Sequence, residues 1–183
     1  MSERERPSKI AGGCLCGSLR YTIDFPEVSS WPPEVTSCQC TKCRKWLSSL
    51  QGIALIIPLK DFSFPCSDSK DASQLRDFES SEDSKRAFCG NCGSGLTFRN
   101  SVHMPDTVEV FVGTLDEEYL IGKVKKGEES KSGQKQEREG GYGKQLAVVQ
   151  ETLFWNQRIE GVTDLSPSGK KWWGMIFDGE SFE

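Results

Sequence analysis

The sequence places seven of its eight cysteines in three tight groups, and this clustering constrains the fold more than any other feature. The groups are Cys14-Leu-Cys16, Cys38-Gln-Cys40-Thr-Lys-Cys43 and Cys89-Gly-Asn-Cys92. Cysteines separated by one or two residues can donate two sulfurs to one metal ion, as in zinc knuckles. Eight cysteines in 183 residues are too few for a disulfide scaffold, in which cysteine exceeds about 8–10% of residues. The spacing therefore predicts zinc sites rather than disulfides.

Seven sulfurs divide into one complete set of four ligands and one set of three. Two separate pairs can clamp two segments of chain together, so we assign the outer pairs to a structural zinc. These ligands are Cys14, Cys16, Cys89 and Cys92. The other three can reach one ion from a single loop and leave its fourth position open; they are Cys38, Cys40 and Cys43. Closed zinc sites are typically structural, whereas open ones can take part in catalysis. Two zinc ions per chain with different roles are expected.

The charge of the open site limits its chemistry. Zinc with three thiolates carries a net negative charge and is a poorer Lewis acid than zinc with three neutral imidazoles, so activation of water is disfavoured. Exchange of a substrate thiolate into the fourth position is favoured instead, because bound zinc deprotonates a coordinating thiol. Lys42, Arg44 and Lys45 surround this group and either hold an anionic substrate or are simply solvated. The sequence therefore points to chemistry at a substrate's sulfur.

The composition narrows the partners and the compartment. The chain has 23 Lys and Arg against 27 Asp and Glu, and this net charge of −4 disfavours a nucleic-acid partner. The longest apolar stretch, 53–59, contains Pro58 and is much shorter than the roughly 20 residues that a membrane-spanning helix needs. The charged start lacks the apolar segment of a secretory signal. We expect a cytoplasmic protein with a small-molecule thiol as its partner and with neither nucleic acid nor membrane.

Alternation of apolar and polar residues predicts a mainly β domain. The expected strands are 18–25, 52–59, 75–78, 95–99, 107–112, 146–155 and 171–177. One short helix is expected at 43–50, with Trp46, Leu47 and Leu50 on one side.

The domain organisation is predicted to be simple. A chain of 183 residues has the length of one domain. We expect residues 1–9 to form an N-terminal tail and residues 10–183 a single domain, with a charged flexible insertion at about 123–145. The core is expected to contain three tryptophans, Trp155, Trp172 and Trp173.

Four motifs together resemble one known family. They are Gly12-Gly-Cys14-Leu-Cys16-Gly17-Ser-Leu-Arg-Tyr21, Cys38-x-Cys40-x-x-Cys43-Arg44, Phe88-Cys89-x-x-Cys92-Gly93-Ser-x-Leu96 and Gly113-Thr-Leu-Asp116. This set resembles the glutathione-dependent formaldehyde-activating enzyme family, also called the centromere protein V/Gfa domain. The resemblance implies a zinc-containing β-tent fold of stacked antiparallel sheets with one or two short helices. It also implies the same division into a four-cysteine structural zinc and a three-cysteine catalytic zinc.

The resemblance further implies a reaction. Members of the family act as carbon–sulfur lyases that join glutathione to formaldehyde, giving S-hydroxymethylglutathione, or cleave such adducts. We therefore expect a zinc-dependent carbon–sulfur lyase with glutathione as co-substrate. Gln39 stands where many members have histidine, and an amide cannot carry a proton at neutral pH. Together with the charged insertion, this departure puts formaldehyde in doubt as the carbonyl partner.

Two other functions fit the same cysteines. The first is a non-catalytic zinc scaffold of centromere protein V type, in which His103 or Cys66 would supply a fourth ligand to the second zinc. The second is a tailoring enzyme that uses the same open zinc site on a larger metabolite. A fourth protein ligand would favour the scaffold, whereas an open position would favour an enzyme.

Overall fold

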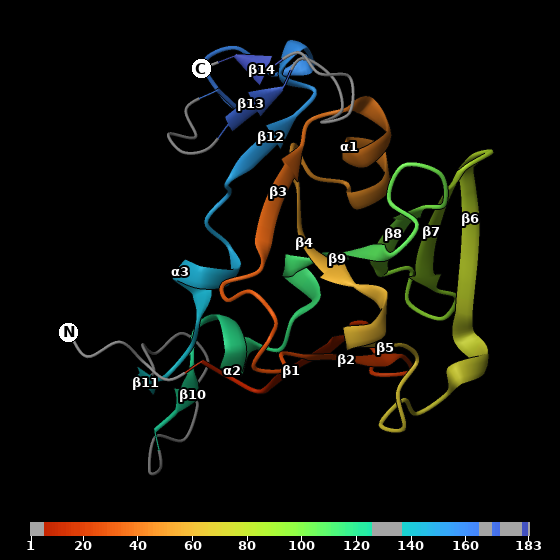
Figure 1. Ribbon diagram of the computed structural model, residues 1–183. Helices are drawn as coiled ribbons and strands as arrows, with labels where there is room; N and C mark the ends of the chain where they lie inside the picture. The colour runs from red at the N-terminus through yellow and green to blue at the C-terminus, as the bar shows by residue number, and fades with distance from the viewer. Residues whose placement is uncertain (1–5, 126–136, 165–169, 173–180, 183) are drawn as a thin grey trace.

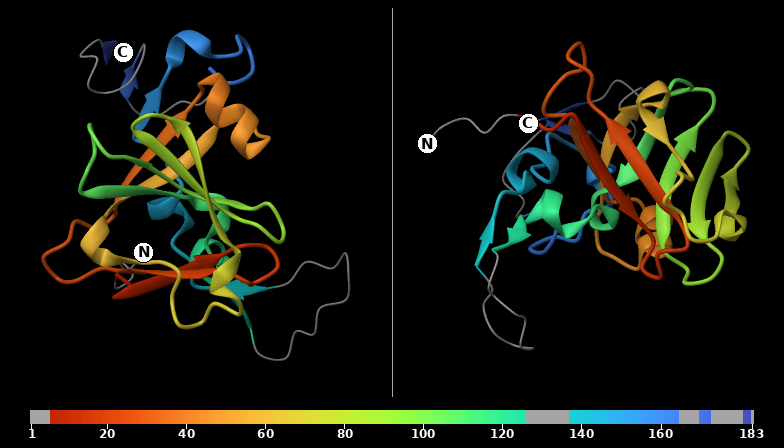
Figure 2. Two further views of the ribbon diagram at one scale, coloured as in Figure 1. Left: turned by 90° about the vertical axis from the view of Figure 1, so that its right-hand side faces the viewer. Right: turned by 90° about the horizontal axis from the view of Figure 1, so that it is seen from below.

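The computed structural model describes residues 6–125, 137–164, 170–172 and 181–182, which form two main β-sheets (Figure 1). The smaller sheet is antiparallel, with the strand order β1-β2-β5. Its strands are β1 (Lys9–Gly13), β2 (Arg20–Asp24) and β5 (Phe62–Ser63). It lies beneath the larger sheet in Figure 1. The left view of Figure 2 again shows β1 and β2 below the other strands, and the right view, seen from below, shows them in front.

The larger sheet has nine strands in the order β14-β13-β12-β3-β4-β9-β8-β7-β6. They are β3 (Glu34–Cys38), β4 (Gly52–Pro58), β6 (Leu75–Ser81), β7 (Ser84–Cys89), β8 (Gly95–Asn100), β9 (Thr107–Phe111), β12 (Glu151–Leu153), β13 (Lys170–Trp172) and β14 (Ser181–Phe182). Strand β12 runs parallel to both of its neighbours, and the other pairs are antiparallel. The prediction of a mainly β fold with stacked antiparallel sheets is confirmed.

The core contains apolar side chains from both sheets. Ile10, Leu19 and Tyr21 are fully buried in the region of β1 and β2, and they belong to the same cluster as Leu55 and Val110 of the larger sheet. Because side chains alternate between the two faces of a strand, the other face of the larger sheet is free to carry different chemistry. That second face holds the site described below.

The helices are short. They are α1 (Thr41–Leu47), α2 (Glu117–Leu120) and α3 (Gly143–Leu146), with 3-10 turns at Leu59–Asp61, Ala72–Gln74, Val112–Thr114 and Trp155–Gln157. The described part of the chain thus has three α-helices, one more than expected, although α2 and α3 are single turns. No helix in that part combines the length and the apolar character needed to cross a membrane.

The predicted helix at 43–50 is displaced in the structure. Helix α1 begins earlier because Cys40 is its N-cap, and the Cys40 sulfur accepts a hydrogen bond from the backbone N–H of Cys43 at 3.3 Å. It ends at Leu47 because Ser48 adopts a left-handed conformation with φ of 49°. Leu50 therefore lies outside the helix and is exposed, contrary to the prediction.

The predicted strand at 146–155 is also wrong over most of its length. Leu146 ends α3, only Glu151–Leu153 pair as strand β12, and Trp155 starts a 3-10 turn. The burial of Trp155 and Trp172 is as predicted. Trp173 and most of the expected strand 171–177 lie outside the described residues.

The predicted N-terminal tail at 1–9 and the predicted insertion at 123–145 both contain residues with defined contacts. Strand β1 begins at Lys9, and Arg6 donates a hydrogen bond to the carbonyl of Ser29 at 3.0 Å. Within the charged segment at 123–145, β10 (Lys123–Val124) pairs antiparallel with β11 (Arg138–Glu139), and α3 begins at Gly143. Residues 126–136 lie outside the described part, so the expected flexibility there stays a prediction.

Two of the four motifs, Gly12–Tyr21 and Gly113–Asp116, contact each other at the junction of the two sheets. A Cβ on Gly12 would lie 2.3 Å from the Tyr21 hydroxyl, so only glycine fits there. That hydroxyl forms a 2.8 Å hydrogen bond with Thr114 Oγ1. Nearby, Arg20 forms a two-bonded ion pair with Asp116, in which Nη1 lies 2.8 Å from Oδ1. These contacts fix the turn after β1, where the first cysteine pair lies.

Candidate metal centres and an adjoining cavity

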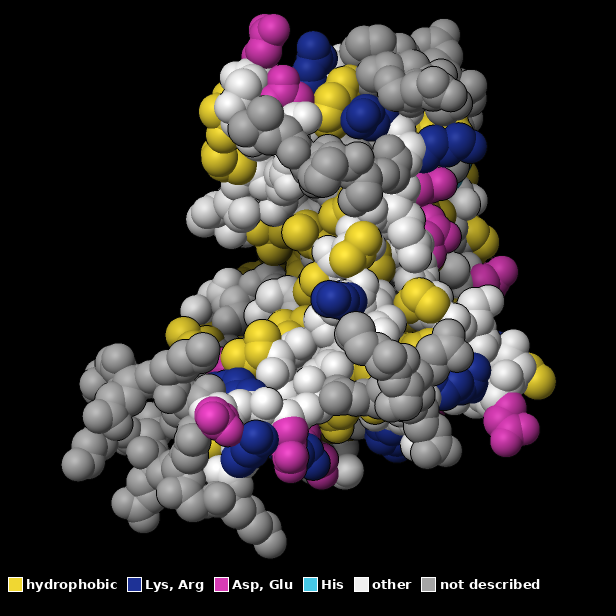
Figure 3. Space-filling view, turned by 90° about the vertical axis from the view of Figure 1, so that its left-hand side faces the viewer, with side chains coloured by type: hydrophobic (Ala, Val, Ile, Leu, Met, Phe, Trp, Pro, Cys, Tyr) yellow, Lys and Arg dark blue, Asp and Glu magenta, His cyan; other side chains and the backbone are white. Residues whose placement is uncertain are grey.

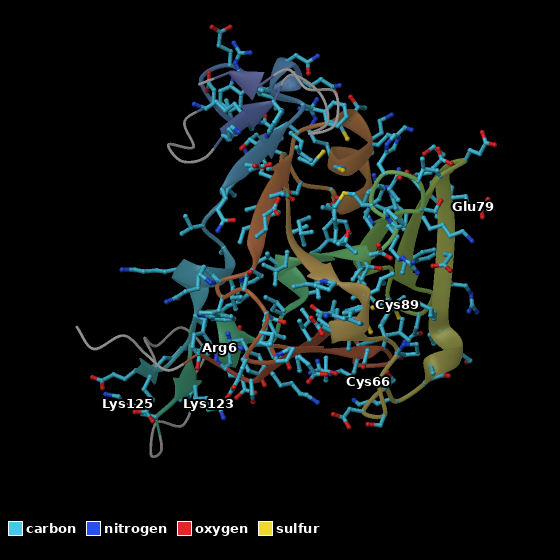
Figure 4. The ribbon with its side chains drawn as sticks, in the orientation of Figure 1. Arg6, Cys66, Glu79, Cys89, Lys123 and Lys125 are labelled. Atoms are coloured by element: carbon cyan, nitrogen blue, oxygen red, sulfur yellow. The ribbon has the colours of Figure 1, made fainter. Side chains whose placement is uncertain are left out.

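Two turns bring together the four-cysteine cluster, which consists of Cys14, Cys16, Cys89 and Cys92. The first pair follows β1, and the second pair lies at the end of β7 and in the turn before β8; Figure 4 labels Cys89. All four sulfurs lie within 4.8 Å of one another, with 3.5 Å between Cys14 and Cys16 and 3.8 Å between Cys16 and Cys89. A tetrahedral zinc with bonds of about 2.3 Å holds its sulfurs roughly 3.8 Å apart. The cluster therefore fits zinc in donor type and spacing.

The surroundings of this cluster favour thiolates. The backbone N–H of Leu19 donates to Cys14 Sγ at 3.2 Å, and Asn91 Nδ2 donates to Cys16 Sγ at 3.3 Å. Hydrogen bonds with the side chain and backbone of Ser18, together with that from Asn91, lower the pKa of Cys16 to about 5. A thiolate is the form that binds a metal.

A single stretch of chain builds the three-cysteine cluster. Cys38 is the last residue of β3, Cys40 is the N-cap of α1, and Cys43 lies within α1. Their sulfurs lie within 4.8 Å of one another, and hydrogen bonds from Cys38 and Cys43 hold the pKa of Cys40 far below its usual range. Among the described residues, no fourth Cys, His, Asp or Glu joins the group at this distance. The donor set again fits zinc, with three ligands from the protein.

The three-cysteine cluster borders a cavity of about 310 Å³. The cavity lies between α1, the β6–β7 hairpin, strands β8 and β9, and the end of β12. Its apolar lining includes Phe98, Leu153 and Phe154. Its charged or ionisable lining, besides the cysteines, is Lys42, Asp83, Arg86, His103 and Glu109. A small organic molecule can thus lie against the cluster with both apolar and charged contacts.

Arg86 joins the cavity to the cluster. Its side chain is 4% exposed, its Nη2 donates to Cys43 Sγ at 3.5 Å, and its Nε donates to Ser80 Oγ at 3.1 Å. The guanidinium lies 4.7 Å from the centre of the Phe98 ring. A buried cation beside a cysteine cluster offsets the negative charge of the thiolates. No sequence pattern singles out Arg86 or Glu109, the two charged strand residues of this cavity.

The basic residues around the second cysteine group have separate positions. Lys42 lines the cavity and donates to the carbonyl of Ser80 at 3.2 Å. Arg44 donates to the carbonyl of Gln157 at 2.8 Å, and Lys45 is exposed. Only Lys42 is therefore placed to meet a molecule in the cavity.

Gln39, Cys66 and His103 are also resolved by the structure. Gln39 is fully buried and hydrogen-bonded to Thr163, and it does not line the cavity. Cys66 lies beside the smaller sheet, where its N–H donates to the carbonyl of Arg20, and Figure 4 shows it far below α1. His103 lines the cavity without belonging to the cysteine cluster.

The chain matches the family model described as glutathione-dependent formaldehyde-activating enzyme over residues 9–130. The chain belongs to this family. Both cysteine clusters lie within the matched residues. The predicted resemblance to the glutathione-dependent formaldehyde-activating enzyme family is thus confirmed.

The chain is also similar to one curated relative and to one solved structure. A Schizosaccharomyces pombe protein named as an uncharacterized lyase is 31% identical over 90 residues, which cover 48% of this chain and 55% of that protein. The match therefore spans about half of the relative's length. A crystal structure of a Rhodobacter sphaeroides protein is similar with a TM-score of 0.47 at 21% identity, covering 58% of this chain and 88% of that one.

The side chains that cover the three-cysteine cluster come partly from beyond the family match. Leu153 pairs with Cys38 across the parallel β12–β3 ladder, and Trp172 and Phe154 pack on the same cluster. These residues lie after position 130, where the match ends. This part of the cavity is therefore a feature of this chain outside the matched family region.

Proposed function

We propose that the protein is a zinc-dependent carbon–sulfur lyase that acts on a glutathione–aldehyde adduct or a related glutathione adduct. The observation that carries this proposal is the position of Cys38, Cys40 and Cys43 at the wall of a 310 Å³ cavity. A structural site would need a fourth protein ligand, and the described residues place none within 4.8 Å of all three sulfurs. Membership of the family supports glutathione as the thiol.

The residues around the cluster fit the chemistry of such an adduct. Zinc held by the three sulfurs would supply a position for the substrate's sulfur and stabilise it as a thiolate. Arg86 donates to Cys43 and reduces the excess negative charge that a further thiolate would meet. Lys42 lies at the same cavity and can hold a carboxylate, of which glutathione has two. The apolar side chains of Phe98 and Phe154 exclude water from the carbon–sulfur bond.

The scaffold alternative gains no support from the positions of its two candidate ligands. Cys66 lies beside the smaller sheet, and the ring nitrogens of His103 are not within 4.8 Å of all three sulfurs. Neither residue closes the second cluster. We therefore keep the enzyme as the single proposal.

The test uses zinc-loaded protein with preformed S-hydroxymethylglutathione and with adducts of larger aldehydes. We expect cleavage well above the uncatalysed rate for at least one adduct, together with two zinc ions per chain. The matched variant is Cys40→Ser, because serine is also a good N-cap and preserves the start of α1. A folded Cys40→Ser protein that cleaves every adduct as fast as the wild type would overturn the proposal.

Figure 3 shows the face that is turned to the left in Figure 1. Its Lys and Arg side chains are interspersed with Asp and Glu, and no large patch of one charge is visible among the side chains drawn. The mixed charges on this face do not suggest a binding surface for a highly charged partner. The proposed substrate is a small molecule that binds in the cavity.

A further inference from the structure

Glu109 occupies a row of side chains that crosses the second face of the larger sheet. Register pairs Arg86 of β7 with Phe98 of β8, Phe98 with Glu109 of β9, Glu109 with Ile56 of β4, and Ile56 with Glu34 of β3. Directly paired residues point to the same face of a sheet. Glu109 is therefore on the face that carries the cavity, beside Phe98 and one strand further from Arg86.

The Glu109 carboxylate is available to a ligand. It lines the cavity together with Cys38, Cys40 and Cys43, and it is partly buried. Among the described residues its oxygens have no hydrogen-bond or ion-pair partner. A partly buried carboxylate without such partners is costly to maintain, which points to a role in the cavity.

The electrostatic surroundings of Glu109 suit proton transfer near neutral pH. Burial raises the pKa of its carboxyl group to about 7; Arg86 from β7 lowers the pKa, whereas Cys40 and Glu34 raise it. The neighbours on β8 and β4, Phe98 and Ile56, are uncharged. The other charged or ionisable groups of the cavity wall are Lys42, Asp83, His103, Cys38 and Cys43. A group that loses its proton near the working pH can both accept and return one.

We infer that Glu109 is the proton carrier of the lyase reaction, and this inference rests on the proposed function. The substrate class is a hemithioacetal, in which one carbon bears both the thioether sulfur and a hydroxyl group. The Glu109 carboxylate accepts the hydroxyl proton while the C–O bond becomes a carbonyl and the carbon–sulfur bond breaks. The bonding pair of the C–S bond leaves with the sulfur as a thiolate. In the reverse direction, the carboxylic acid returns the proton to the oxygen.

The position of Gln39 strengthens this inference. Gln39 is buried against Thr163 and points away from the cavity, so it does not supply a proton carrier there. His103 and Asp83 line the cavity, but both lie in turns outside the sheet, and His103 is exposed. Glu109 is held on a strand and shares the cavity wall with the cysteines. It is therefore the carboxylate with the most fixed position relative to the cluster.

The test compares Glu109→Gln with Glu34→Gln. Both variants make the same chemical change in the same row, but Glu34 lines a different cavity. The measurements are kcat and KM for cleavage of S-hydroxymethylglutathione or another adduct that the wild type cleaves, zinc per chain, and the Kd for glutathione by calorimetry. We expect Glu109→Gln to lower kcat by about 100-fold or more, since general acid–base catalysis typically contributes that much. Zinc content and the glutathione Kd should not change, and Glu34→Gln should keep the wild-type kcat at pH 8, where Glu109 is mostly ionised with or without the charge of Glu34.

The outcomes separate this inference from the proposed function. A wild-type protein that cleaves no adduct overturns both. Cleavage by the wild type with a Glu109→Gln kcat within about threefold of it overturns the proton-carrier role alone. The role is also overturned if His103→Gln, and not Glu109→Gln, abolishes turnover. Partial recovery of kcat in Glu109→Asp would support a carboxylate as the working group.

Discussion

The two cysteine clusters differ in how far apart along the chain their ligands lie. The four-cysteine cluster joins the turn after β1 to the end of β7, so Cys16 and Cys89 meet across 73 positions. The three-cysteine cluster comes from one stretch between β3 and α1. Ligands that are distant in sequence crosslink the fold, whereas ligands from one stretch leave room beside the ion. Sequence separation thus distinguishes a cluster suited to stability from one suited to chemistry.

The surroundings of the two clusters also differ, in hydrogen bonding, packing and access to a cavity. Hydrogen bonds from Leu19 and Asn91 reach the first cluster, and the neighbouring Leu15 is 90% exposed. The second cluster is packed by Leu153 and by Trp172, and it borders the cavity. The four sulfurs of the first cluster can therefore fill all four positions of a tetrahedral zinc. The second cluster supplies only three sulfurs; packed side chains cover one part of it, and another part faces the cavity.

The largest effect is expected from Cys89→Ser. Structural zinc contributes about 10–16 kcal/mol of apparent binding energy in zinc-finger peptides, which is as large as the net stability of a typical domain, roughly 5–15 kcal/mol. Loss of the buried Cys89 should therefore unfold the protein or leave it without a cooperative melting transition by circular dichroism. Cys66→Ser is the control, because Cys66 belongs to neither cluster. A Cys89→Ser protein with the wild-type melting temperature would remove the structural role from this cluster.

In contrast to Cys89→Ser, the Cys40→Ser variant should keep its fold and lose its activity. We expect one zinc ion fewer per chain and adduct cleavage reduced to background, with a change in melting temperature of only a few degrees. Serine keeps the N-cap bond to the N–H of Cys43, whereas Cys40→Ala also removes the cap and should cost about 1 kcal/mol more. Zinc analysis and thermal melting of both variants measure this. Unfolding of Cys40→Ser would mean that the two clusters do not divide stability and chemistry between them.

The parts of the molecule that could be predicted are those with a local signal. Cysteines separated by one or two residues must lie close together in any fold, so each pair and the group of three followed from spacing. The meeting of the two pairs across 73 positions has no local signal and is expected only from dividing seven sulfurs between two ions. Alternating apolar residues such as Tyr21 and Ile23 identified β2, and both are fully buried. A pattern carried by neighbouring residues can be recognised from the sequence, because it does not depend on which strand becomes the partner.

The missed parts lack such a signal. Strand β7 buries the polar residues Ser84 and Arg86 as well as Ala87 and Cys89, so the usual alternation of apolar and polar residues is absent. Strand β3 buries Thr36 and Ser37 in succession because it has neighbours on both sides. The meeting of Arg86 with Glu109 and the cysteines depends on the register of several strands. No local pattern encodes that register, so the cavity could not be found before the fold.

Glu109→Gln should show, as a dependence of stability on pH, how much stability the protein loses by placing the Glu109 carboxylate in the cavity wall. The pKa of Glu109 is raised in the folded protein to about 7 from 4.5. Below pH 4 the carboxyl group is protonated in both states and the substitution should change little. As the pH rises from 4.5 through 7, the unfolded chain ionises more readily, so the wild type loses stability that the glutamine variant keeps.

The expected gain for Glu109→Gln at pH 8 is on the order of 1–2 kcal/mol, reduced by solvent screening of a partly exposed group. Urea denaturation at pH 4 and pH 8 measures it, with Glu27→Gln, at an exposed position, as the control. Equal stability of Glu109→Gln and wild type at both pH values would mean that the carboxyl group is not strained by its surroundings. A gain at pH 8 alone would sharpen the contrast between a stabilising cluster and a cavity that costs stability.

The smallest effect is expected from Tyr21→Phe, at the junction near the four-cysteine cluster. The variant loses the hydrogen bond to Thr114 Oγ1 but keeps the buried ring, and Thr114 still donates to the carbonyl of Phe111 at 2.7 Å. One lost hydrogen bond with a satisfied partner should lower the free energy of unfolding by about 1 kcal/mol. A urea double-mutant cycle with Thr114→Val measures the coupling. A coupling of several kcal/mol would mean that hydrogen bonds, and not the sulfurs, hold this junction; a coupling near 1 kcal/mol would leave the metal cluster as its main support.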